Sequence, residues 1–363
     1  MLQYLYHPIS VLLLSIIVGM TVILVVVLKK LSAKEKVAKP VFISQASITS
    51  KQEDAEIIQR FKDKADQAMH LNNTFRKFVP KQFVDHFAKH GSNSLELGHA
   101  DEDELAILFC DIRGFTGLSE RMSPQELMNF LNSYFMRMND PIHQNGGFID
   151  KFIGDAIMAL FDHPTGSNKD KSLDSIRAAL DLRYALNVYN QHRSNSNYPA
   201  INIGIGIHFG PVIIGTVGSD DRMDTTVIGD SVNIAFRLEG LAPIYNTDIV
   251  VSAQTLEVAE AAKYFSYRIL DWVRVKGRMA PIEIYELIDH QDKSVQQLKL
   301  ANAHLIQQGL KNRIKQQWPQ AMAHFQEALL LNPEDTLVIH HIEQCQILKK
   351  QKLAKNWDGA LVL

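Results

Sequence analysis

The sequence has very little cysteine and almost no net charge. Only Cys110 and Cys345 occur in the chain, far apart, so neither a disulfide framework nor a thiolate metal site is expected. The formal net charge is −2 over 363 residues, which gives no sign of the clustered basic surface that nucleic-acid-binding proteins usually carry. The chain is long enough for a sizeable core and one auxiliary unit.

Long apolar runs are also scarce, with one exception near the N-terminus. Residues 8–28 are uncharged and apolar, and the run has about the length that a helix needs to cross a bilayer. Residues 1–10 contain no Lys or Arg, unlike the start of a signal peptide. Basic residues follow the run directly, at Lys29, Lys30, Lys34, Lys36 and Lys39. By the positive-inside rule, residues 1–30 are then a single-pass anchor in the inner (plasma) membrane, with the N-terminus outside and the remainder cytoplasmic.

The stretch 105–161 contains a strand, a helix and a hairpin in succession. An apolar run, Leu105 to Cys110, predicts a buried strand that ends at Asp111. Ser123 followed by Pro124 predicts the N-cap and first residue of a helix. Two further strands, at 148–152 and 156–161, are separated by a turn that contains Asp155.

This arrangement places Asp111 and Asp155 on neighbouring strands of one sheet. A single Asp in such a position is most often a turn or cap residue. Two carboxylates on adjacent strands can instead share divalent cations, and a pair of such ions can stabilise the attacking and leaving oxygens of an in-line displacement.

The residues around both aspartates carry a specific resemblance. FCDIRGFT (109–116) and DKFIGDAIMALF (150–161) closely resemble the catalytic domain of class III nucleotide cyclases, and the match covers about residues 105–287. The resemblance implies an α/β catalytic domain at 101–290 with a ferredoxin-like βαββαβ core. It also implies two Mg²⁺ or Mn²⁺ ions per site, held by Asp111, Asp155 and the carbonyl group of Ile112.

The second half of this domain contains two further helices and a hairpin. Residues 173–191 have helical apolar spacing, and INIGIGIHFG (201–210) predicts a strand that allows close backbone packing. We expect Gly210-Pro211 to break this strand and 212–217 to form its hairpin partner. A helix should start at Asp230 or Ser231 and pack four apolar residues inward, namely Val232, Ala235, Phe236 and Leu238.

The resemblance also assigns the substrate-binding residues. Asn233 and Arg237 are four residues apart and share one helical face. In the family, an Asn and an Arg in this N-x-x-x-R pattern position the ribose and stabilise charge on the reacting phosphoryl group. Arg222 and Lys276 match the basic residues that contact the triphosphate.

Two positions bear on the choice of nucleotide. Lys151 stands where adenylyl cyclases have a Lys that reads adenine and guanylyl cyclases have a Glu; Lys can donate to N1 of adenine but not to N1–H of guanine. Thr226 matches a bacterial, Thr-bearing subgroup of adenylyl cyclases, some of which respond to bicarbonate. The pair predicts conversion of ATP to 3′,5′-cyclic AMP and pyrophosphate in cyclic-nucleotide signalling.

Helical segments are expected on both sides of the catalytic domain. Residues 31–100 read as a cytoplasmic linker, either a solvated helix or a short coiled coil. The seam of such a coil would be Ile58, Phe61, Ala65, Ala68, Asn72 and Phe75. Pro80 should start a further helix with Phe83, Val84 and Phe87 on one face, and the acidic run 101–104 should connect to the first strand.

The C-terminal segment, 291–363, is helical and rich in Gln. Five of its residues have the offsets of a tetratricopeptide repeat: Gly309, Ala321, Phe325, Ala328 and Pro333. Any helical hairpin is the simpler alternative. Because one repeat cannot bury its faces alone, it must pack on the catalytic domain, on a protein partner or on a second copy.

The family resemblance implies a head-to-tail homodimer with two shared sites, since one chain holds both the aspartates and the Asn/Arg pair. A guanylate cyclase and a catalytically silent membrane scaffold stay open as alternatives. A diguanylate cyclase is excluded because the chain has no GG-D/E-E-F loop.

Overall fold

The computed structural model describes residues 26, 29, 45–75, 80–83, 98, 100–163, 165–219, 221–274, 280–354 and 357–362. The chain divides into two compact units, 1–75 and 76–363. In the first unit, α2 (Gln45–Phe75) is one helix of 31 residues, and its Ile58 and Phe61 side chains are exposed. The coiled-coil pairing of this helix stays a prediction.

The expected membrane span at 8–28 falls outside the described residues, apart from Val26. Among the residues that the structure describes, no helix is both long and apolar enough to cross a membrane.

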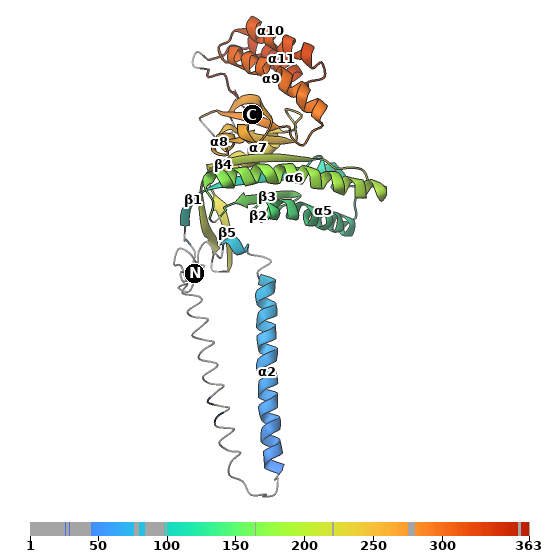
Figure 1. The fold of residues 1–363 in the computed structure, drawn as a ribbon, viewed down its shortest axis with the longest axis vertical. Coiled ribbons are helices and arrows are strands. Elements are labelled where there is room, and N and C mark those ends of the chain that lie inside the picture. Colours follow the sequence, from blue (N-terminus) through green and yellow to red (C-terminus); the bar gives the residue numbers. More distant parts are fainter. Residues whose placement is uncertain are drawn as a thin grey trace. The chain divides into compact units, whose positions relative to one another are not determined.

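In the second unit, the described strands form one sheet with both parallel and antiparallel pairs (Figure 1). Its order is β2 (Phe148–Ile153), β3 (Ala156–Phe161), β1 (Ala100–Ile112), β4 (Ile203–Ser219), β6 (Ile249–Ser252), β8 (Ile282–Leu287), β7 (Tyr267–Arg274) and β9 (Leu361–Val362), with β5 (Arg222–Ile228) paired to β4. Neighbours in the series β2-β3-β1-β4 are antiparallel. This is the order expected of the predicted βαββαβ core.

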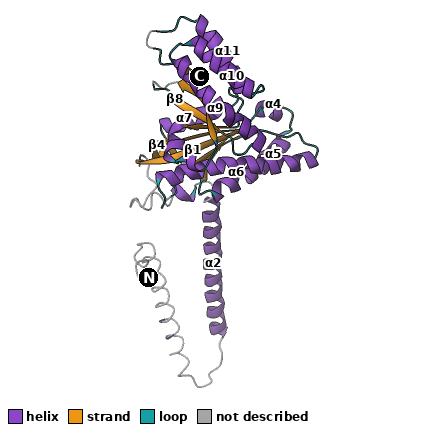
Figure 2. Ribbon diagram, turned by 45° about the horizontal axis from the view of Figure 1, so that its top comes forward, coloured by secondary structure: helices purple, strands orange, loops and turns teal. Residues whose placement is uncertain are grey.

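Helices cover both faces of this sheet (Figure 2). α5 (Pro124–Gln144) and α6 (Asn168–Asn195) share a hydrophobic core with alternate residues of β1 and β4. α7 (Asp230–Leu241) packs against β4 and β1. The short helices α4 (Phe115–Ser119), α8 (Ala253–Val258) and η1 (Ala261–Lys263) lie in the connections.

The alternation of Ile and Gly in β4 explains how α7 approaches the sheet. Ile203, Ile205 and Ile207 are buried in the core with α5 and α6. A Cβ atom on Gly206 would lie 2.2 Å from the backbone nitrogen of Glu239 in α7. The helix therefore rests directly on the strand backbone, as the sequence predicted.

Several boundaries differ from the expectations. The acidic run 101–104 belongs to β1, where it pairs with 211–214 of β4. β4 continues through Pro211, because this proline lies between the segment that pairs with β6 and the segment that pairs with β5. The hairpin partner of β4 is therefore β5, and the prediction that 212–217 is a separate strand was wrong.

The predicted start and inward face of α7 also need correction. Gly229 is the N-cap residue, instead of Asp230 or Ser231. Phe236, which was expected to be buried, is 54% exposed, and Ile234 is buried instead. By contrast, the predicted start of α5 is correct, since Ser123 and Glu126 form a reciprocal capping box.

Residues 80–83, here called the approach segment, contribute to the core. Lys81–Phe83 is helical, as expected after Pro80, and Phe83 is buried with its ring edge-on to Phe148 at 5.4 Å. Val84 and Phe87 lie outside the described residues.

The C-terminal segment forms α9 (Lys293–Ile314), α10 (Trp318–Leu331) and α11 (Thr336–Lys350) (Figure 1). Gly309 lies so close to Phe325 that a Cβ atom would be 2.4 Å from the ring, so α9 and α10 pack tightly. These helices share one hydrophobic core with α7, β7 and β8. Of the three packing partners considered above, the catalytic domain is therefore the one observed, while the tetratricopeptide assignment stays a prediction.

Candidate active site

The antiparallel pairing of β1 and β3 brings the two predicted metal ligands together. Cys110 lies opposite Ile157, so Asp111 and the β2–β3 turn with Asp155 meet at the same end of the sheet. Gly154 adopts a φ of 65° in that turn, a conformation that glycine adopts without strain. The backbone N–H of Ile112 donates to Oδ2 of Asp155 at 3.3 Å.

Asp111 and Asp155 are close enough for the Asp111 carboxylate to disfavour ionisation of Asp155. The pKa of Asp155 is raised to about 7. Burial is the largest cause, and the hydrogen bond and negative charge of Asp111 act in the same direction. Oδ1 of Asp111 is buried without a hydrogen-bond partner. A buried carboxylate oxygen without a partner and a neighbouring acid that resists ionisation fit a divalent cation, which would satisfy the oxygen and offset both charges.

A second contact connects this loop to α7. Arg113, which follows the predicted metal-binding residues, points Nη1 at Oε1 of Glu239 at 3.4 Å, and its Nη2 lies 3.5 Å from the carbonyl oxygen of Thr247. Burial raises the pKa of Glu239 to about 7 despite Arg113. The helix that carries Asn233 and Arg237 is thus tied to the residue that directly follows β1, the strand that carries Asp111.

Lys151 and Thr226 lie together on a different part of the sheet. Thr226 Oγ1 donates to Oδ2 of Asp150 at 3.2 Å. Lys151 Nζ lies 3.1 Å from Oδ2 of Asp224 and 3.8 Å from Oδ2 of Asp150. The pairing of β2 with β3 shifts between Ile149 and Lys151, so Asp150 is the extra residue of a β-bulge.

Of the remaining predicted residues, the structure describes Asn233, Arg237 and Arg222. Asn233 is exposed, Arg237 is half-buried, and Arg222 is exposed at the end of the β4–β5 hairpin. Within the described part of the chain, no hydrogen bond or ion pair joins Asp111 or Asp155 to the Asn/Arg pair. Lys276 lies outside the described residues.

A pocket of about 330 Å³ lies elsewhere, against α8 and η1. Its lining includes Leu256, Glu257, Tyr267 and Tyr285, and none of the predicted site residues. This pocket is therefore separate from the candidate site.

Two functional candidates were missed from the sequence, Asp150 and the Arg113–Glu239 pair. The signal for Asp150 was its position beside Lys151, but strict strand alternation would have placed the two side chains on opposite faces. Only the bulge brings both toward β5. Arg113 and Glu239 are 126 residues apart, and no local pattern connects them.

The family model for the adenylate and guanylate cyclase catalytic domain matches residues 97–289. The match covers more than half of the chain, and the chain belongs to this family. An adenylate cyclase of Anabaena cylindrica is 44% identical over 220 residues, which are 59% of this chain and 43% of that protein. The terminal-differentiation specific adenylate cyclase of Dictyostelium discoideum is 34% identical over 276 residues, 76% of this chain and 13% of that protein.

Among solved structures, a bacterial light-regulated adenylyl cyclase superposes with a TM-score of 0.56 at 28% identity, covering 67% of this chain and 69% of that one. The chain spans less than half the length of each of these two curated relatives.

Proposed function

We propose that this protein is a class III adenylate cyclase that converts ATP to 3′,5′-cyclic AMP and pyrophosphate. The observation that carries the proposal is the carboxylate pair, in which Asp155 lies in hydrogen-bonding reach of Asp111 and Asp111 keeps an unpartnered oxygen. Asp111, Asp155 and the Ile112 carbonyl group would hold two Mg²⁺ or Mn²⁺ ions. When bound, these ions lower the pKa of the ribose 3′-hydroxyl group and offset charge on the phosphates.

The choice of ATP is supported by the hydrogen-bond polarity around Asp150. An ionised carboxylate only accepts hydrogen bonds, so the Thr226 hydroxyl group must donate to it and keeps its own lone pairs free. Those lone pairs can accept from the 6-amino group of adenine, and the Lys151 ammonium group can donate to N1. Guanine presents the reverse pattern, with an acceptor at position 6 and a donor at N1.

The other side chains act on the phosphates and ribose. Asn233 would orient the ribose, and the Arg237 guanidinium group would donate to the phosphoryl oxygens, on which negative charge accumulates in the transition state. Arg222 and Lys276 would hold the terminal phosphates. None of these steps requires a covalent intermediate with the protein.

We further propose that two chains form each site. The absence of direct contacts between the aspartates and the Asn/Arg pair in the described residues supports this arrangement. Apolar side chains that are 40% exposed or more surround the substrate-binding residues: Phe152, Ile153, Val217, Met223, Ile228 and Phe236. A homodimer through the catalytic domain would cover them, since such patches usually mark an interface.

Residues outside the catalytic domain would set its location. The apolar run 8–28 would anchor the chain in the plasma membrane, with the N-terminus outside and the catalytic domain in the cytoplasm. The predicted seam of α2, of which Ile58 and Phe61 are exposed, would pair with its copy in the dimer. Membrane fractionation of the intact protein beside a variant that lacks 1–30 tests this location; recovery of both in the soluble fraction contradicts it.

Turnover assays on the purified full chain test the activity. The wild type should form cyclic AMP from ATP with Mg²⁺ or Mn²⁺, and should form little cyclic GMP from GTP. Asp111→Ala should remove the product, while Asp140→Ala, at an exposed carboxylate on α5, should not. Equal turnover of GTP would contradict the adenine reading, and an active Asp111→Ala protein would contradict the metal site.

A further inference from the structure

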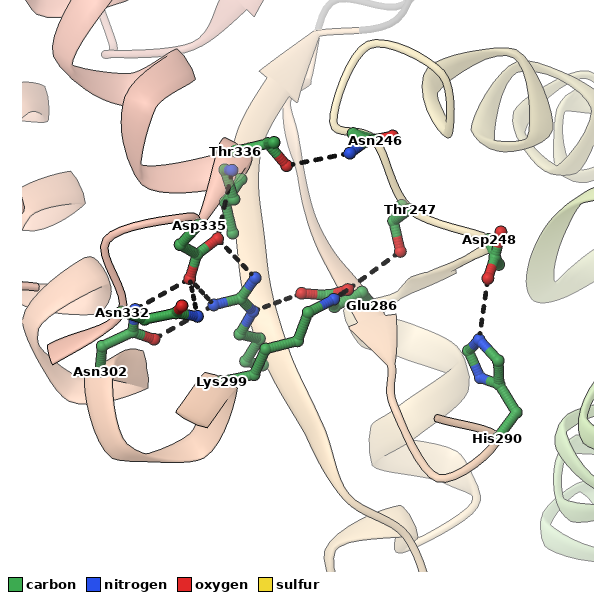
Figure 3. Close-up of polar contacts among 12 residues, drawn as sticks. Asn246, Thr247, Asp248, Glu286, His290, Lys299, Asn302, Asn332, Asp335 and Thr336 are labelled. Carbon is green, nitrogen blue, oxygen red and sulfur yellow. Dashed lines mark hydrogen bonds and ion pairs between the residues drawn. The ribbon is translucent and has the colours of Figure 1, made fainter. Parts of the chain in front are cut away.

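The segment that follows α7 makes a series of polar contacts toward the C-terminal helices. The Tyr245 hydroxyl group donates to Oδ2 of Asp271 at 2.9 Å, and Asp271 is paired with Arg313 of α9. Asn246 donates to the hydroxyl group of Thr336 in α11 at 3.2 Å (Figure 3). The three residues 245–247 are consecutive, and each one is involved.

Thr247 makes the third of these contacts. Its hydroxyl group donates to Oε2 of Glu286 at 3.0 Å, and the same oxygen accepts from Lys299 of α9 at 2.7 Å (Figure 3). Glu286 also pairs with Arg268 of β7, which reaches Oδ1 of Asp335 at 3.0 Å at the start of α11. Arg268, Glu286 and Asp335 are almost fully buried.

A bulge in β7 makes both ion-pair systems possible. The pairing of β7 with β8 shifts between Ile269 and Asp271, so Leu270 is the extra residue. Arg268 and Asp271, three residues apart, are therefore both turned toward the C-terminal helices. The carbonyl oxygen of Leu270 accepts from Nε2 of His341 in α11 at 2.8 Å.

The same segment is tied to the catalytic helix and to the metal-binding loop. The N–H groups of Tyr245 and Thr247 donate to the carbonyl oxygens of Leu241 and Ala242 at the end of α7. The carbonyl oxygen of Thr247 lies 3.5 Å from Nη2 of Arg113. Ile234 and Leu238 of α7 lie in the same hydrophobic core as Leu310 and Phe325 of the C-terminal helices.

We propose that the C-terminal helices are a positioning element of the active site, and that Tyr245, Asp271 and Arg313 hold the end of α7 so that Asn233 and Arg237 meet the substrate correctly. The inference rests on the proposed function, because α7 acts in catalysis only if the protein is a cyclase. Burial of apolar side chains holds the helices on the sheet. The buried charges fix the register at which they dock, a role for which buried polar groups are known. Residues 291–363 are on this view a part of the catalytic unit and not a detachable partner-binding module.

The test uses the full chain and compares three variants with the wild type. Tyr245→Phe removes only the hydroxyl group and leaves Asp271 paired with Arg313. Tyr285→Phe is the matched control, because Tyr285 also donates to a carboxylate, Glu283, but packs against the opposite core. The third variant combines Asp271→Leu with Arg313→Met, which replaces the ion pair by apolar groups and should keep the protein folded.

Tyr245→Phe and the double variant should lower kcat for ATP by roughly 10-fold, as displaced catalytic groups do, with KM and the metal concentration for half-maximal activity unchanged. Tyr285→Phe should match the wild type.

Wild-type kcat in the folded double variant would overturn the inference, as would a loss of kcat in Tyr285→Phe equal to that in Tyr245→Phe. These failures are distinct from failure of the proposed function, in which the wild type itself forms no cyclic AMP. A parallel loss of folded protein and activity in Tyr245→Phe, with kcat per folded molecule unchanged, would also overturn it.

Discussion

Asp150 is a residue at which nucleotide selection and stability should oppose each other. Its side chain is 0% exposed, and burial raises its pKa from 3.8 to about 6, although Lys151 and Thr226 act in the opposite direction. The folded chain therefore binds this proton more tightly than the unfolded chain does. Ionised Asp150 therefore lowers the free energy of unfolding. The same charge accepts the hydrogen bond of the Thr226 hydroxyl group, which leaves the Thr226 oxygen free to accept from adenine.

The change Asp150→Asn removes the ionisation and keeps the shape of the side chain. A shift of about two pKa units corresponds to about 3 kcal/mol at 1.36 kcal/mol per unit. Below pH 3.8, Asp150 is protonated in both states, so wild type and variant should be equally stable. As the pH rises from 3.8 through about 6, the wild type loses this stability and the variant does not. Above that range the variant should be more stable by about 3 kcal/mol.

Urea denaturation of both proteins at a series of pH values from 4 to 8 measures this difference. Asp155 and Glu239 have raised pKa values too, but both occur in wild type and variant, so their effects cancel in the comparison. Asp224→Asn is the control, because that carboxylate is 60% exposed. The variant should also favour ATP less, since an Asn side chain can donate to Thr226 as well as accept from it. An Asp150→Asn protein that is less stable than wild type at pH 8, or a difference that does not change with pH, would refute the reasoning.

Three further predictions concern the packing around the site. Gly206→Ala should destabilise the protein by about 1–3 kcal/mol in urea denaturation and lower activity, since its Cβ atom would meet the α7 backbone, whereas Gly240→Ala on the open side of α7 should not destabilise it. Phe83→Ala should lower the free energy of unfolding by about 3–5 kcal/mol if the approach segment is part of the core; an unchanged midpoint would contradict that placement. Ser123→Ala removes the cap of α5 and should lower the unfolding free energy by about 1 kcal/mol, with Ser119→Ala as the comparison; equal losses would speak against the capping box.

The central part of the fold could be predicted because its signals are local. Apolar runs, the Ser123 cap and the glycine turns at 146 and 154 each act within a few residues, and together they placed Asp111 and Asp155 at one end of the sheet. The pattern of Ile and Gly in β4 likewise predicted close backbone packing, and the structure shows that α7 is the element that packs there.

The features that were missed depend on contacts between distant segments. Pro211 ordinarily ends a strand, and only its position between two pairing segments allows β4 to continue. Phe236 was expected inside because it is apolar, but it is exposed, beside the Arg237 that is proposed to bind substrate. Arg268 and Arg313 are buried because each is paired with carboxylates, and these partners lie 18 to 67 residues away, so no local pattern in the sequence connects them.

Mixing two inactive variants tests most directly whether each site is shared between two chains. Asp111→Ala lacks a proposed metal ligand and Arg237→Ala lacks the guanidinium group proposed to bind the phosphoryl group, so each homodimer should be inactive. After co-expression, a mixed dimer has one site in which both changes meet and one site that is entirely wild type. Random pairing makes half of the dimers mixed, so activity should return to about a quarter of the wild-type value. If the mixture stays as inactive as its components while mixed dimers are present, the aspartates and the Asn/Arg pair do not converge across the interface, and the account is contradicted.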